Sequence, residues 1–207
     1  MIKRISLKIT NFIFRSTTLD TELFEVCKYR IEITISTLLN IFLIIAAGMI
    51  LSDIISGMIF LAVYISLFPF VGGYHAKTHF LCNALFLLTY LLIYFINSIA
   101  LALVEGELYS RLLTVLILLG IIPIIAFAPV QHKNRPLSEI QLLICRTIGI
   151  AAFILISITA LALHYGGIKY GSFMTITLAS VSVSILIEVS KQRRKKDSAQ
   201  GKDSENR

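Results

Sequence analysis

The sequence predicts an all-α, polytopic membrane protein with about six transmembrane helices and an N-terminal amphipathic helix in the membrane interface. Three observations support this fold class. The chain is 57% hydrophobic and only 15% charged, whereas a soluble domain is about half apolar and a quarter charged. Its apolar residues gather in long runs between short polar connectors. Its 19 lysines and arginines flank these runs instead of covering one face, so we expect a lipid bilayer and not nucleic acid as partner.

Residues 1–31 are predicted to form an amphipathic segment at the cytosolic surface. Apolar residues recur there at helical spacing, namely Ile2, Ile5, Ile9, Phe12 and Ile13. The basic residues between them suit a helix that lies in the interface and anchors the chain. A docking surface for a substrate helix is the sharper alternative. The segment has no continuous apolar core with a small-residue cleavage site, so we expect no removable signal peptide.

Residues 32–190 are predicted to form the membrane domain. Six runs lack any ionisable side chain and approach the roughly 20 residues that span a bilayer: 33–51, 54–70, 80–104, 112–129, 147–163 and 171–187. A re-entrant second segment is the alternative to a full second span, because that run is short. Ion-coupled transport is disfavoured, since coupled transporters usually carry ionisable residues inside their spans.

The distribution of basic residues predicts the orientation in the cell membrane. With the N-terminus inside, every lysine and arginine except Arg111 and Lys169 lies at the cytosolic face, as the positive-inside rule requires. Both termini are therefore expected in the cytosol. Residues 191–207 form a basic, polar tail that we expect to be disordered and to attract anionic lipid.

The connector at 71–82 is the most informative stretch for chemistry. It combines Cys82 with His75 and His79, and a cysteine nucleophile needs a nearby histidine as base and as stabilising cation. The positive end of the helix that begins near Cys82 would also favour the thiolate. His79 is the local rival to His75 as base, because i,i+3 neighbours meet on a helix.

The spacing between His75 and Cys82 sets a geometric condition. Seven residues of straight helix rise about 10.5 Å, which is too far for contact. His75 is therefore expected on a loop that folds back over the helix start, and Gly72 and Gly73 give the backbone the freedom to do so. The backbone N–H groups from Phe80 to Cys82 are the default donors for an oxyanion.

Two other interpretations of this connector remain open. In the first, Cys82 is a small apolar residue at the interface beside a basic loop. In the second, His75, His79 and Cys82 bind a metal ion, because they are ligand types that zinc prefers. Zinc peptidases place a glutamate directly after the first histidine, and Ala76 occupies that place here. We therefore expect thiol chemistry without a metal or another cofactor.

Two segments resemble one known family. The run Gly-Gly-Tyr-His-Ala-Lys-Thr at 72–78, with Cys82 seven residues after the histidine, resembles the hallmark of the accessory gene regulator B (AgrB) family of membrane peptidases in Gram-positive quorum sensing. The run Ala-Pro-Val-Gln-His-Lys-Asn-Arg-Pro-Leu at 128–137 resembles that family's second cytosolic motif. Size, hydropathy and the basic tail agree with this resemblance.

The resemblance implies a cysteine endopeptidase with Cys82 as nucleophile and His75 as general base. Its substrate would be an AgrD-type propeptide, which such enzymes cleave after the signal segment and close into a thiolactone or lactone ring. The sequence departs from many relatives at 68–71, where Phe-Pro-Phe-Val stands in place of an arginine shortly before the glycine pair. A cationic role at that place is therefore in doubt.

The basic connectors are candidates for substrate binding. Lys77 in the first connector, and Lys133, Asn134 and Arg135 in the second, would clamp acidic residues of the propeptide segment that is discarded. The plainer interpretation is that these loops only set the topology. The remaining cysteines, Cys27 and Cys145, are expected to be structural, as small buried hydrophobes.

Two functions from other classes are the alternatives to a peptidase. One is a membrane transporter, and the other is a non-catalytic scaffold for a small peptide. A Cys82→Ala variant that still processes the precursor would favour the scaffold. The number of subunits is not predicted, and a homodimer remains open.

Overall fold

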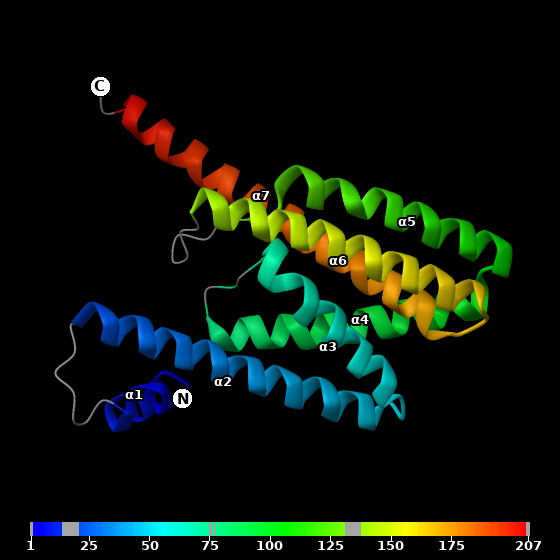
Figure 1. The fold of residues 1–207 in the computed structure, drawn as a ribbon, viewed down its shortest axis with the longest axis horizontal. Helices are drawn as coiled ribbons and strands as arrows, with labels where there is room; N and C mark the ends of the chain where they lie inside the picture. The colour runs from blue at the N-terminus through cyan, green and yellow to red at the C-terminus, as the bar shows by residue number, and fades with distance from the viewer. Residues whose placement is uncertain (1, 14–20, 75, 77, 131–137, 206–207) are drawn as a thin grey trace. The chain divides into compact units, whose positions relative to one another are not determined.

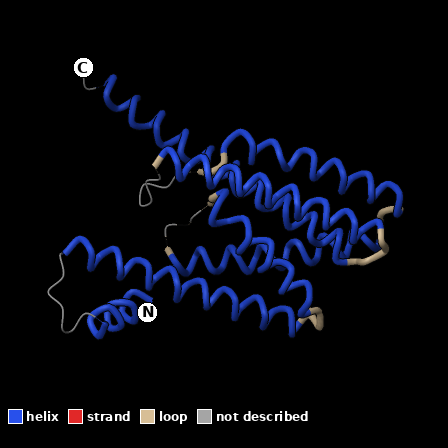
Figure 2. Tube along the Cα trace, viewed as in Figure 1, coloured by secondary structure: helices blue, strands red, loops and turns tan. Residues whose placement is uncertain are grey.

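The computed structural model of the chain describes residues 2–13, 21–74, 76, 78–130 and 138–205. Across these residues all regular structure is helical (Figures 1 and 2). The helices are α1 (Ile2–Ile13), α2 (Thr21–Ile50), α3 (Ile54–Val71), α4 (His79–Leu103), α5 (Gly106–Phe127), α6 (Glu139–Tyr165) and α7 (Tyr170–Glu205). Within the described ranges, the six from α2 to α7 are long and apolar enough to cross a membrane. The predicted all-α polytopic fold is thus confirmed.

Capping side chains and turn residues explain where some of these helices begin and end. Ser138 caps α6: its hydroxyl accepts from the Gln141 N–H, and the Gln141 side chain accepts from the Ser138 N–H. This reciprocal pair is the capping box, which satisfies two backbone donors that the helix leaves open. Between α2 and α3 the chain turns at Ser52, whose φ is 54°. The second predicted span is one helix of 18 residues.

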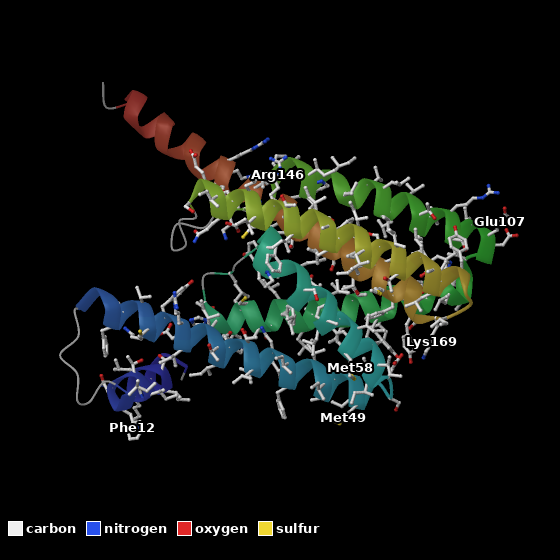
Figure 3. The ribbon with its side chains drawn as sticks, in the orientation of Figure 1. Phe12, Met49, Met58, Glu107, Arg146 and Lys169 are labelled. Carbon is white, nitrogen blue, oxygen red and sulfur yellow. The ribbon has the colours of Figure 1, made fainter. Side chains whose placement is uncertain are left out.

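One compact unit contains residues 1–54 and 76–88, and therefore α1, α2 and the first part of α4. α1 lies along α2 (Figure 1) and turns two hydroxyl residues, Ser6 and Thr10, into the unit, where both are fully buried. Its apolar side chains are exposed instead, with Phe12 at 78% (Figure 3). A helix with an exposed apolar stripe suits the membrane interface that the sequence predicted.

The second unit contains residues 55–75 and 89–207, and therefore α3, the rest of α4, and α5 to α7. α7 packs against both α5 and α6 (Figure 1). Where α7 meets α5, the Ser182 hydroxyl donates to the Gly120 carbonyl over 2.7 Å. Small residues at such contacts let helix backbones approach closely, as is usual inside membranes. Large side chains fill the core beside them, including Phe60, Tyr90 and Phe153.

The two ends of this second unit differ in charge. Arg146 lies at one end, and Glu107 and Lys169 lie at the other (Figure 3). The first end also holds basic residues of α7, because Arg193 lies over the Phe127 ring with 5.6 Å between its guanidinium carbon and the ring centroid. The assignment of this basic end to the cytosol rests on charge and stays a prediction.

α7 is longer than the sixth predicted span. It continues to Glu205, so the structure has a helix where the sequence led us to expect a disordered tail from residue 191. The tail is rich in Lys and Arg, which are good helix formers, and propagation from an existing helix needs no new nucleus. The domain boundary after residue 190 remains a prediction.

Candidate functional site

Cys82 lies at the start of α4. Thr78 precedes the helix and caps it, since the Leu81 N–H donates to the Thr78 hydroxyl over 3.2 Å. The Cys82 N–H donates to the Thr78 carbonyl over 3.0 Å, the first backbone bond of the helix. The Cys82 side chain is half-buried. The thiol is therefore held on a rigid element close to the positive end of the helix dipole.

Ala76, in the connector before α4, lies beside this thiol. The Cys82 side chain is hydrogen-bonded to the backbone of Ala76, although Ala76 precedes the helix. Its neighbours His75 and Lys77 lie outside the described residues. Contact between His75 and Cys82 therefore stays a prediction, and so does the loop that would carry His75 over the helix start.

Two of the three expected oxyanion donors are already engaged. The Leu81 and Cys82 N–H groups both bond to Thr78. The Phe80 N–H lies in the first turn of α4, where the N–H groups of a helix have no carbonyl partner within it. The oxyanion role expected of these N–H groups stays a prediction.

Gly72 ends α3 and brings the two connectors together. Its φ is +71°, a left-handed conformation that favours glycine. A Cβ here would lie 2.8 Å from the Val130 carbonyl oxygen, and the Val130 N–H donates to the Val71 carbonyl over 3.1 Å. Since Val130 opens the second connector, both connectors leave the helical unit at the same place.

Gly73 is required by packing. A Cβ at this position would lie 2.6 Å from a ring carbon of Phe68 and 2.8 Å from the Ser184 hydroxyl. The sequence predicted that the glycine pair loosens the backbone. The structure gives the two glycines different roles: Gly72 makes a left-handed turn, and Gly73 allows close contact with α3 and α7.

Tyr74 continues the connector onto α7. The Lys191 ammonium lies over its ring, 4.4 Å from the centroid, and also pairs with the buried Glu188 carboxylate over 3.1 Å. A cavity of about 690 Å³ opens beside this contact. Its lining combines apolar and basic side chains and consists of Tyr74, Val183, Leu186, Ile187, Ser190, Lys191 and Arg194.

Residues 131–137 of the second connector lie outside the described residues. They include Lys133, Asn134 and Arg135, whose predicted role in binding stays a prediction. The helix that follows is fixed at this end by Arg146, whose guanidinium donates to the Ile125 carbonyl of α5 over 2.8 Å. The second connector thus links the ends of two helices, α5 and α6, that contact each other.

The sequence analysis missed one buried carboxylate in the first unit. Glu32 is only 6% exposed. Its Oε1 accepts from the Ser6 hydroxyl of α1, and its Oε2 bonds to Nε2 of His79 at the start of α4, both over 3.2 Å. The apolar run begins at Ile33, so Glu32 was placed outside the span. The signal that could have found it is its position as the last charge before that run.

The described residues include all three cysteines but only part of the predicted zinc site. All three cysteines are free and half-buried. In the ranges that the structure covers, no three His, Cys, Asp or Glu residues gather in a way that could hold a metal ion. The zinc alternative includes His75, which lies outside those ranges, and is therefore not tested.

Comparisons with known proteins agree with the motif resemblance. Residues 6–189 match the profile of a family described as Accessory gene regulator B. An AgrB-like protein of Clostridium perfringens (strain 13 / Type A) is 28% identical over 138 residues, which are 66% of this chain and 64% of that protein. The chain thus matches just under two thirds of this relative's length. No solved structure matches.

Proposed function

Because this chain belongs to the accessory gene regulator B family, we propose that it is a membrane-embedded cysteine endopeptidase that processes an AgrD-type quorum-sensing propeptide. The observation that carries the proposal is the position of Cys82. Its thiol stands at a capped helix start, and the backbone of Ala76, the residue after His75 in the sequence, is hydrogen-bonded to it. A fixed thiol beside a histidine-bearing loop is the arrangement that nucleophilic catalysis needs.

The proposed reaction has two acyl transfers. The Cys82 thiol gives its proton to His75, and the thiolate attacks the carbonyl of the last residue of the signal segment. The peptide C–N bond breaks, the leaving amine takes the proton from His75, and a thioester to Cys82 remains. A thiol or hydroxyl within the propeptide then attacks this thioester, closes the thiolactone or lactone ring and releases Cys82. An apolar bundle around the thioester would limit the competing attack by water.

The second connector is proposed to bind the acidic, discarded part of the propeptide. Support comes from the contact between Val130 and Gly72, which starts the two connectors at one place. The test is to replace Lys133 and Arg135 together with glutamine. Rim charges mainly raise the association rate and are screened by salt, so the apparent substrate requirement should rise several-fold and its salt dependence should flatten. An unchanged salt slope would mean that this connector only sets topology.

The proposed orientation places both termini in the cytosol. Single cysteines at Asp53 and Lys169, in a background without native cysteines, should react with an impermeant reagent from outside intact cells, and one at Thr78 should not. The reverse pattern would invert the topology and move the Cys82 helix start to the outer face.

The peptidase proposal is tested by co-expression with the candidate precursor. The wild type should yield a smaller peptide, and Cys82→Ala should yield none. Cys145→Ala is the matched control, since Cys145 is also a half-buried thiol, and it should process normally. Equal processing by the wild type and Cys82→Ala would reject the cysteine peptidase. It would favour a scaffold for the peptide.

A further inference from the structure

We propose that Glu32 is a positioning residue for Cys82, because it joins α1 and α2 to the first turn of α4. This inference rests on the proposed nucleophilic role of Cys82. Glu32 belongs to a helix apolar enough to cross a membrane, where a carboxylate is costly unless its oxygens are bonded. Both oxygens are bonded here, and each takes a partner from a different helix.

A second contact lies one helical turn further along the same two helices. The Ser36 hydroxyl donates to Oδ1 of Asn83 over 2.7 Å, and both side chains are buried. Glu32 and Ser36 are four residues apart on α2, and their partners His79 and Asn83 are four apart on α4, so each pair shares one helix face. The two contacts therefore form successive rungs between the helices.

Cys82 lies between these two rungs. It follows His79 by three residues and directly precedes Asn83. One contact between two helices leaves them free to rotate, whereas two contacts a turn apart fix both the rotation and the axial register of the first turn of α4. The direction in which the Cys82 thiol points is thus set by the rung at Glu32 and the rung at Ser36.

α1 enters the same arrangement through the other carboxylate oxygen. The Ser6 hydroxyl reaches Glu32, and the Thr10 hydroxyl donates to the Ser6 carbonyl over 2.8 Å, which braces that turn of α1. Loss of the carboxylate would therefore remove the first rung between α2 and α4 and the bond from Ser6 of α1, and leave the Ser36 rung in place. Glu32 therefore bonds both to the interfacial helix α1 and to the helix start that carries Cys82.

This geometry gives His79 a role other than general base. Its Nε2 faces Glu32, so the ring acts as a donor that fixes the helix start. A His79→Gln variant keeps an N–H donor for Glu32 and should retain Cys82 reactivity, whereas His79→Leu removes the donor and should slow it. A general base at this position would be lost in both variants.

The test measures alkylation of Cys82 in the full chain, with Cys27 and Cys145 replaced by serine so that one thiol remains. Glu32→Ala should slow alkylation by iodoacetamide at neutral pH about fivefold, since the bonds to an ionised group are lost. Glu32→Gln keeps an acceptor and a polar partner and should recover most of the rate. Glu25→Ala is the matched control, because Glu25 is on the same helix with a side chain 67% exposed, and it should match the wild type.

Processing kinetics in the same variants add a second readout. Glu32→Ala should lower kcat and leave KM near the wild-type value, because the thiol and not the substrate contacts are displaced. Equal alkylation rates in folded Glu32→Ala and Glu25→Ala would overturn the inference, and so would Glu32→Gln as slow as Glu32→Ala. If Glu32→Ala does not fold, the pair His79→Gln and His79→Leu decides, and equal rates in that pair overturn it. Processing by Cys82→Ala would instead reject the peptidase itself.

Discussion

Two buried glutamates lie near the ends of spans, and their partners differ. Glu188 on α7 is 3% exposed and bonds to Lys191 and Gln192, three and four residues later on the same helix. Glu32 on α2 is 6% exposed and bonds to Ser6 of α1 and His79 of α4. One carboxylate has partners along its own helix, whereas the other has partners on two neighbouring helices.

Contacts of the first kind stiffen one helix, whereas contacts of the second kind hold separate helices together. The Glu188 contacts can form as soon as α7 is helical, because i,i+3 and i,i+4 neighbours already face each other. They hold Lys191 against Tyr74, next to the proposed base His75. The Glu32 contacts exist only after three helices have met. The proposed base His75 thus lies next in sequence to a residue that touches the Glu188 contacts, which are made within one helix. The proposed nucleophile Cys82 lies beside the Glu32 contacts, which are made between helices.

The largest expected effect is on stability. Glu32→Ala should lower the free energy of unfolding by about 2 kcal/mol, because the Ser6 hydroxyl and the His79 ring both lose their partner. Glu188→Ala should cost about half as much, since Lys191 keeps the Tyr74 ring and can turn its ammonium toward solvent. Unfolding of the detergent-solubilised protein by heat or denaturant measures both. A larger loss in Glu188→Ala would reverse the comparison.

A smaller effect is expected at the contact between Lys191 and Tyr74. Lys191→Gln removes the cation from the ring, a contact of about 0.5–2 kcal/mol, and should slow Cys82 alkylation about twofold through the loosened loop around His75. Lys191→Arg keeps a cation and should restore the rate. Alkylation of the single-thiol protein checks this. A slowing as great as that in Glu32→Ala would mean that the two clusters matter equally to the thiol.

The smallest expected effect is a coupling between α1 and α4 that passes through Glu32. Ser6→Ala and His79→Leu should be non-additive by about 0.6 kcal/mol, the usual size for interhelical hydrogen bonds in membranes. The coupling should vanish when Glu32 is already alanine. A double-mutant cycle on unfolding free energies in both backgrounds measures it. A coupling that persists without Glu32 would show that another contact joins the helices.

The sequence predicted the fold well because long apolar runs have few alternatives in a bilayer. It predicted the place of Cys82 at a helix start from the polar residues that precede it. It did not predict that one helix runs without a break from Thr21 through the first span, because hydropathy detects the apolar core of a span and not its polar first turns. Glu32 was missed for that reason.

Contacts between segments that are distant in the chain could not be predicted from the sequence. Gly72 was recognised as a flexible position, but its close approach to Val130 depends on where α5 ends in space. The engagement of the Leu81 and Cys82 N–H groups follows from the Thr78 cap, which a closer look at the helix start could have predicted. The roles of His75 and Arg135, which lie outside the described residues, rest on the motifs alone.

The character of α7 bears on how the chain is made. Its membrane segment has the lowest mean hydropathy of the six, 1.8, and the largest buried share, 50%. Its hydroxyls bond to backbone carbonyls, as Thr177 does to Phe173 and Ser182 to Gly120. Such a segment gains less from lipid than its predecessors and more from α5 and α6. We therefore expect that it leaves the translocon against helices already in the bilayer, so that this sixth span depends on earlier ones for its insertion.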